Sequence, residues 1–171
     1  MNPAAKLVSK RLQPIVESAP NIIHLTKDLV QKLSKLNIDT TRKWYIMTGD
    51  VVAFYPNIPL EKCLNVIKEL HFEHYFVGQA QPYSRYNTNQ QKFFSLCCDA
   101  RNTQLITQFN GQIYEQLNGL AIGTGDSPDL ANLFFWGHYL ECKAHVLQHP
   151  IIFYYGCYID DCIAIEFAEN I

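Results

Sequence analysis

The sequence predicts a single α+β domain in which an antiparallel β-sheet carries helices packed on one face. The 171 residues are 48% apolar, and a chain of this size buries one sizeable core. From Trp44 onward, the patterns follow the order strand, helix, hairpin, helix, strand and strand. This order is typical of an α+β fold.

The first part of the chain, residues 1–43, reads as a helical segment that leads into this domain. Pro14 is expected to end or kink the first helix, because proline removes a backbone donor. A second helix is expected to begin near Thr26, whose hydroxyl can cap the following amides. Leu25 and Val30 fit a hydrophobic staple at its start.

A short apolar run over residues 44–53 predicts a central strand, with Asp50 near its end. Pro56 and Pro59 cannot continue that strand in a ladder, and Pro59 suits the first turn of a following helix. That helix carries apolar residues at helical spacing and is predicted to be a core helix. The stripe consists of Leu60, Cys63, Leu64, Ile67 and Leu70.

The middle of the chain predicts a connection, a helix and a hairpin. Residues 71–88 are aromatic and polar and read as an irregular connection, whose path the sequence leaves open. Residues 90–101 predict a helix. Residues 105–117 alternate around Asn110 and Gly111, and Asn-Gly is the strongest short signal for a β-hairpin.

The last part of the chain predicts one helix and two strands. Ser127 and Pro128 begin the helix, which extends to about His145. Residues 151–167 are almost wholly apolar except for the pair Asp160-Asp161. They therefore read as two strands joined by a tight turn made of those aspartates.

Charge is unevenly divided along the chain. The net charge is −2, whereas nucleic-acid partners usually select a basic surface. Residues 1–50 hold eight Lys or Arg and four Asp or Glu, and residues 51–171 hold six and twelve. An acidic body is expected if it gathers carboxylates around metal ions; the alternative is a chance asymmetry.

The sequence also indicates in which cellular compartment the protein is expected. The chain shows no signal-peptide pattern at its start and no apolar run of the ~18 residues that span a bilayer. Its six cysteines include no C-x-x-C pair, and a disulfide framework belongs to short secreted chains. We therefore expect buried free thiols and an intracellular protein with no membrane partner. The sequence does not separate a nuclear from a cytoplasmic location.

The paired aspartates need a positive charge beside them. Two carboxylates inside an apolar hairpin repel each other and lose hydration unless a cation lies nearby. In a ferredoxin-like sheet, Asp50 would lie beside the tip that carries Asp160 and Asp161. Such hard oxygen donors suit Mg²⁺ (or Mn²⁺), and two ions about 4 Å apart can support nucleotidyl transfer. A lone Asp-Asp pair, by contrast, would be read as a solvated turn.

Taken together, these motifs resemble the palm of a reverse transcriptase, and most closely that of the Penelope-like retroelement group. The resemblance extends from about Trp44 to Glu166, so residues 44–171 are expected to form a palm domain with incomplete fingers and thumb. It is carried by residues 50–59 (DVVAFYPNIP), residues 119–123 (GLAIG) with Ser127-Pro128 and Ala131-Asn132, and residues 158–161 (YIDD).

The resemblance implies RNA-directed DNA polymerase activity with two metal ions. By position in the motifs, Asp50 and Asp160 would bind metal directly, helped by the backbone carbonyl of Val51. Asp161 would be a weaker ligand or a structural carboxylate. The implied partners are an RNA template, a DNA primer and deoxynucleoside triphosphates, with further fingers and thumb segments on a longer polyprotein.

The same resemblance implies a nucleotide site at Val51, Phe54, Tyr55 and Gly123. Tyr55 would clash with a ribonucleotide 2′-hydroxyl and so select deoxynucleotides; ordinary core packing is the alternative for this ring. Gly123 would let the backbone approach the nucleotide, because glycine has no Cβ.

Tyr158 and Ser127 would lie near primer and template. The sequence departs from the family pattern at Ile122 and at Asp126, which would add negative charge near a template phosphate.

Two other functions share these motifs. A reverse-transcriptase-derived fragment could serve as a non-catalytic RNA-binding or interaction module. An RNA-dependent RNA polymerase or a telomerase-like palm would use the same carboxylates, although Tyr55 argues against an RNA polymerase, which needs room for the 2′-hydroxyl.

Overall fold

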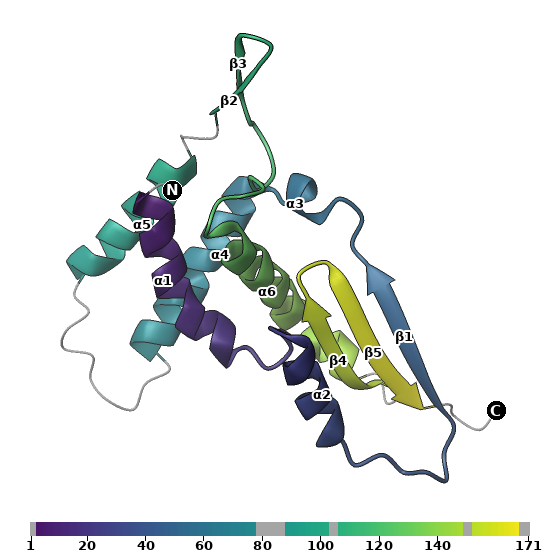
Figure 1. Ribbon diagram of the computed structural model, residues 1–171. Helices are drawn as coiled ribbons and strands as arrows, with labels where there is room; N and C mark the ends of the chain where they lie inside the picture. The colour runs from purple at the N-terminus through teal and green to yellow at the C-terminus, as the bar shows by residue number, and fades with distance from the viewer. Residues whose placement is uncertain (1–2, 78–87, 103–105, 149–151, 168–171) are drawn as a thin grey trace.

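The computed structural model describes residues 3–77, 88–102, 106–148 and 152–167 (Figure 1). Helices and an antiparallel sheet make up the chain, as the α+β prediction requires. In chain order the elements are α1 (Pro3–Ser18), α2 (Thr26–Ser34), β1 (Trp44–Asp50), α3 (Phe54–Asn57), α4 (Leu60–Phe72), the π-helical turn η1 (Glu73–Val77), α5 (Thr88–Asn102), β2 (Ile106–Phe109), β3 (Gln112–Glu115), α6 (Ser127–Gln148), β4 (Ile152–Tyr158) and β5 (Asp161–Phe167).

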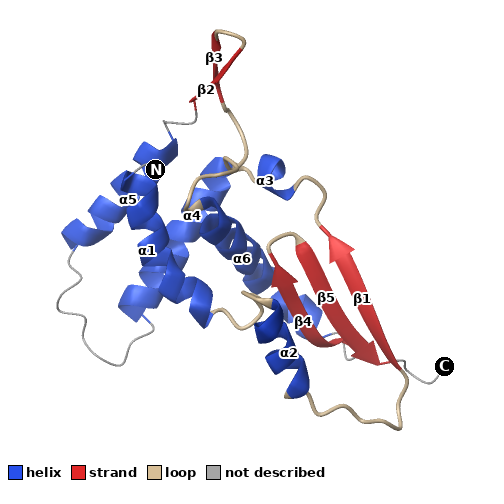
Figure 2. Cartoon of the chain, viewed as in Figure 1, coloured by secondary structure: helices blue, strands red, loops and turns tan. Residues whose placement is uncertain are grey.

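Three of the strands form the main sheet, in the order β1-β5-β4, and both pairings are antiparallel (Figure 2). The central strand is therefore β5, and the prediction that residues 44–53 form the central strand was wrong. In the described part of the chain, β1 pairs on one side only and ends at Asp50. The tight turn between β4 and β5 also differs from the prediction, because it consists of Ile159 and Asp160, while Asp161 already belongs to β5.

Helix α6 covers one face of this sheet. The ring of Tyr155, on β4, stacks on Phe135 and on Tyr139 of α6. Side chains alternate between the two faces of a strand, so Tyr158, three residues further along β4, faces away from α6. Helix α6 thus covers one face, whereas α2 lies over the other face at the strand ends and bounds the site described below.

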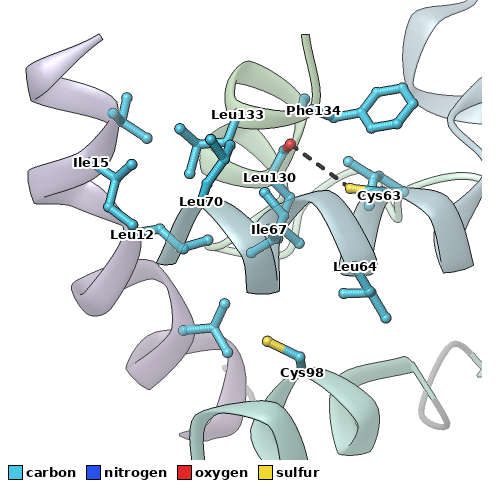
Figure 3. Close-up of a cluster of buried hydrophobic side chains, with 14 of the residues drawn as sticks. Leu12, Ile15, Cys63, Leu64, Ile67, Leu70, Cys98, Leu130, Leu133 and Phe134 are labelled. Atoms are coloured by element: carbon cyan, nitrogen blue, oxygen red, sulfur yellow. Dashed lines mark hydrogen bonds between the residues drawn. The ribbon is translucent and has the colours of Figure 1, made fainter. Parts of the chain in front are cut away.

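The hydrophobic core lies between α1, α4, α5 and α6 (Figure 3). The predicted apolar stripe of α4 is buried as a whole, which confirms that it is a core helix. The thiol of Cys63 points at the Leu130 carbonyl of α6, 3.9 Å away. Since Leu12 of α1 belongs to the same cluster, the N-terminal helix shares one core with the palm-like region. Within the described residues, no helix is both long and apolar enough to cross a membrane.

The two N-terminal helices correct several sequence predictions. Helix α1 continues through Pro14 to Ser18, because its buried apolar face packs on the core and outweighs the lost hydrogen bond. Helix α2 begins at Thr26 as predicted, but no side chain caps it. Its start is instead held by the Asp28 carboxylate, which accepts the His24 N–H at 3.1 Å. The predicted staple is absent, since Leu25 is 67% exposed.

The region predicted as an irregular connection starts in helical form. Helix α4 extends to Phe72, and the π-helical turn follows it directly to Val77. The remainder of that connection, residues 78–87, lies outside the described residues. The helix predicted over residues 90–101 is α5, and the hairpin around Asn110-Gly111 is β2–β3, with positive φ at both turn residues. Figure 1 shows this hairpin projecting beyond the helices.

Gly119 lies where the loop before α6 contacts the backbone of α3. Its φ is +81°, and a Cβ there would lie 2.7 Å from the Pro56 carbonyl oxygen and 2.9 Å from that of Tyr55. The next residue, Leu120, donates its N–H to the Tyr55 carbonyl at 2.9 Å. Close backbone contact, which only glycine allows here, therefore fixes this loop against α3.

Gly119→Ala is expected to lower the free energy of unfolding by about 3 kcal/mol, because a left-handed backbone and a clash with main-chain atoms add together. Gly123→Ala is the matched control: its φ is +95°, but nothing lies within 4 Å of the added Cβ. The control should lose only about 1 kcal/mol. Urea denaturation of both variants measures the difference, and equal losses would show that the contact with Pro56 carries no energy.

His71 is a buried core histidine at the end of α4. Its ring stacks on Phe94 with centroids 3.8 Å apart, and its Nδ1 lies 2.9 Å from the Gln91 side-chain oxygen. Burial lowers the pKa of His71 from 6.5 to about 4. The folded chain therefore keeps this ring neutral at a pH where the unfolded chain protonates it.

The His71 contribution to stability is complete above the unfolded pKa and is lost as the pH falls toward the folded one. Lowering the pH from about 7 to about 5 is expected to reduce the free energy of unfolding by roughly 2 kcal/mol through this group. Chemical denaturation across this range, compared with His71→Phe, isolates the effect. Parallel pH profiles for the two proteins would contradict it.

Candidate active site

The three predicted catalytic aspartates come together at one end of the sheet. The register pairs Asp50 of β1 with Asp161 of β5, and Asp161 with Tyr158 of β4. The third aspartate, Asp160, lies in the turn, and its carbonyl accepts the N–H of Val51 at 2.9 Å. Residues more than a hundred positions apart in the sequence thus share one sheet end.

The turn that carries Asp160 has a strained backbone. Ile159 adopts φ +56°, although a β-branched side chain strongly disfavours positive φ. Ala53, just before α3, also has a positive φ of 50°. Strained backbone of this kind collects at functional sites, where the surrounding structure holds it in place.

A cleft of about 710 Å³ opens beside the aspartates. One wall is the end of the sheet, and the other comes from α2 and the residues just before it. Its lining residues are Ile23, Leu25, Thr26, Leu29, Thr48, Gly49, Asp50, Tyr158, Asp161, Cys162 and Ile163. The α2 wall was not predicted from the sequence, because no local pattern indicates that a helix this far upstream folds back over the strand ends.

Tyr55 lies within electrostatic range of the turn. Burial raises the pKa of the Tyr55 phenol, and the negative charges of Asp160 and Asp129 raise it further. Phe54, one residue earlier, is buried and packs edge-to-face on the rings of Tyr55 and of Phe135 from α6. The predicted nucleotide contacts of both residues remain predictions, while the structure shows Phe54 supporting Tyr55 from the core.

The segment from Gly119 to Ser127 is exposed around Gly123 and buried at Ser127. Gly123 is unobstructed, and its neighbour Ile122 is 83% exposed. Ser127 is buried, and its hydroxyl donates to the Ala121 carbonyl at 2.7 Å and lies 2.5 Å from the Thr124 hydroxyl. The structure thus gives Ser127 a role in closing the turn before α6, and its contact with primer or template stays a prediction.

Asp126 does not face a template phosphate, which corrects the sequence-based expectation, because its side chain is completely buried. It lies close enough to Asp129 for its charge to act there. Burial, and then the Asp126 charge, raise the pKa of Asp129, while the Ser9 hydroxyl, which donates to the Asp129 carboxylate at 2.6 Å, opposes the rise. These acids belong to the start of α6.

The donors that could hold a divalent metal are the carboxylates of Asp50, Asp160 and Asp161 and the carbonyl of Val51. All are hard oxygen atoms, the type that Mg²⁺ and Mn²⁺ prefer. Across the described ranges, no three His, Cys, Asp or Glu side chains converge into a preformed metal-binding group.

The sheet order, the carboxylate-bearing turn and the face covered by α6 are those of a polymerase-like α+β fold. Solved structures that share this fold include telomerases. That of Candida albicans, in complex with the TWJ fragment of telomeric RNA, superposes with a TM-score of 0.71 at 13% identity, over 96% of this chain and 30% of that one. Apo telomerase from Candida tropicalis, truncated from its C-terminal domain, gives 0.64 at 12% identity, over 96% and 34%.

These similarities concern the fold. The chain spans about a third of the length of the telomerase chains that it matches. No protein-family model matches the sequence, and no curated protein does.

Asp160→Asn is expected to lower the pKa of Tyr55, because it removes a negative charge that disfavours the phenolate. The matched control is Asp161→Asn, since Asp161 is not among the charges that act on Tyr55. NMR titration of ring-labelled tyrosine, assigned with Tyr55→Phe, gives both values. An equal shift in the two variants would mean that Tyr55 does not face the turn.

Proposed function

We propose that this chain is the palm of an RNA-directed DNA polymerase, which transfers nucleotides to the 3′-hydroxyl of a primer. The observation that carries the proposal is the strand register, because it pairs Asp50 with Asp161 while the adjacent backbone bond joins Val51 to Asp160. The cleft beside these residues is large enough to admit a substrate of nucleotide size.

In this proposal, Asp50, Asp160 and the Val51 carbonyl hold two Mg²⁺ or Mn²⁺ ions, with Asp161 as a weaker ligand. Bound ions would stabilise the attacking 3′-oxygen and the leaving pyrophosphate of an in-line displacement. The chain itself supplies the alignment, since the ladder fixes Asp161 and the hydrogen bond to Val51 fixes the turn. The cleft between α2 and the sheet face opposite α6 would receive the nucleic acid.

Substrate selection would belong to the segments around α3 and Gly123. Tyr55 would exclude the 2′-hydroxyl of a ribonucleotide, and its buried neighbour Phe54 holds the ring in position. Gly123 would allow close approach of the nucleotide backbone, which its open surroundings support. Tyr158 is half exposed at the end of β4, where it would contact the primer end.

An RNA template is the proposed partner, together with a DNA primer and deoxynucleoside triphosphates. Support comes from the Candida albicans telomerase, whose structure contains telomeric RNA. Within the reverse transcriptases, the motifs favour the Penelope-like retroelement group. Fingers and thumb segments would come from a longer polyprotein, acting inside the cell.

Asp50→Asn and Asp160→Asn are each expected to lower Mg²⁺-dependent extension of a DNA primer on an RNA template by at least about a hundredfold, because each removes a ligand charge at the reacting centre. Asp99→Asn is the matched control: this acid pairs with Lys68 on the surface at 2.8 Å and should leave extension unchanged. Incorporation of labelled deoxynucleotide at high protein concentration measures the effect.

Two results would contradict the proposal. Extension that persists in both carboxylate variants would separate the activity from this site. Binding of the RNA–DNA duplex that ignores Mg²⁺, with no extension by the wild-type chain, would support the non-catalytic binding module instead.

A further inference from the structure

Two thiols lie directly behind the aspartate turn. Cys157 on β4 and Cys162 on β5 are partners in the ladder, one position further from the turn than Tyr158 and Asp161. Their sulfur atoms are 3.3 Å apart. Since a disulfide bond is about 2.0 Å long, roughly 1 Å of movement would join them.

The backbone around Cys157 has the geometry that a cross-strand disulfide requires. Its N–H donates to the Asn21 carbonyl at 2.8 Å, and its carbonyl accepts the Ile23 N–H at 2.7 Å. Both groups therefore point away from β5, so Cys157 and Cys162 form a non-hydrogen-bonded pair. The Cα atoms of such a pair lie about 4.5 Å apart with their side chains close together, which is inside the range found for disulfides.

The two thiols differ in access. Cys157 is buried, 3.1 Å from the Tyr155 hydroxyl. Cys162 is half-buried, and its ladder partner on the other side is Gly49. Nothing lies within 4 Å of the position that a Gly49 Cβ would take, so open space adjoins Cys162. A small reagent can reach Cys162 first, with Cys157 placed to resolve the product.

We propose that Cys157 and Cys162 form a reversible modification site that takes a small-molecule disulfide such as oxidised glutathione. The Cys162 sulfur attacks one glutathione sulfur and releases the other half as glutathione thiol. Cys157 then attacks the Cys162 sulfur of the mixed disulfide and releases the second glutathione. The two protein thiols are oxidised, one glutathione disulfide is reduced to two thiols, and the two protons leave with them.

The new bond would tie β4 to β5 immediately beside Asp160. It would also remove the S–H that Cys157 donates to Tyr155, whose ring packs on α6. The site is independent of the proposed polymerase activity, because its formation is measured without nucleic acid. Failure of one proposal therefore leaves the other untouched.

The sequence makes the test direct. No Lys or Arg follows Lys143, so trypsin releases residues 144–171 as one peptide that contains Cys157, Cys162 and no other cysteine. The folded chain is treated with oxidised glutathione, denatured, labelled with N-ethylmaleimide and digested. We expect an unlabelled peptide two hydrogens lighter than the reduced form, and two labels after prior reduction with dithiothreitol.

Three controls make the result specific. Cys142→Ser, which removes an exposed thiol just upstream, should give the same peptide. In Cys162→Ser, Cys157 should acquire no glutathione, because it is buried. Chain unfolded in urea should form the bond at least about tenfold more slowly.

The proposal is overturned if both cysteines of the treated folded chain still take the label, if glutathione stays on Cys162 as a stable adduct, or if the bond forms equally fast in urea.

Discussion

The placement of β5 between β1 and β4 is the constraint on which the rest of the structure depends. Through its two ladders, Asp161 has Asp50 on one side and Tyr158 on the other. The same strand aligns Cys162 with Gly49 and with Cys157 one step behind. A shift of one residue in either ladder would send these side chains to opposite faces of the sheet. The relative positions of the site residues therefore depend on the strand register more than on any single carboxylate.

The elements of the fold were largely readable from local patterns, and the errors came from long-range effects. The buried stripe of α4 and the Asn110-Gly111 hairpin depend on neighbours in sequence, so the sequence revealed them. The continuation of α1 through Pro14 depends on packing against other helices, which overrides the local preference of proline. The order of the strands depends on which pairs form in space, so residues 44–53 were misread as the central strand.

The site divides along the same line. The location of Asp50, Asp160 and Asp161 at the same end of the sheet could be predicted, because short motifs carried the resemblance. Two features could not be predicted: the contribution of α2 to the cleft wall and the burial of Asp126. Both follow from how distant segments pack. In the sequence, Cys157 and Cys162 are only two cysteines that flank residues 158–161. The facing of their sulfur atoms follows from the pairing of β4 with β5.

The contact between Gly119 and Pro56 has a consequence for how the site keeps its shape. One hydrogen bond joins Leu120 to Tyr55, and the absence of a Cβ at Gly119 allows close contact with Pro56. These contacts link two loops that are more than sixty residues apart in the chain. Tyr55 and the exposed segment around Gly123 are therefore anchored at a common point and are expected to move together as one rigid unit. A conformational change in either loop is thus transmitted to the other without passing through the sheet.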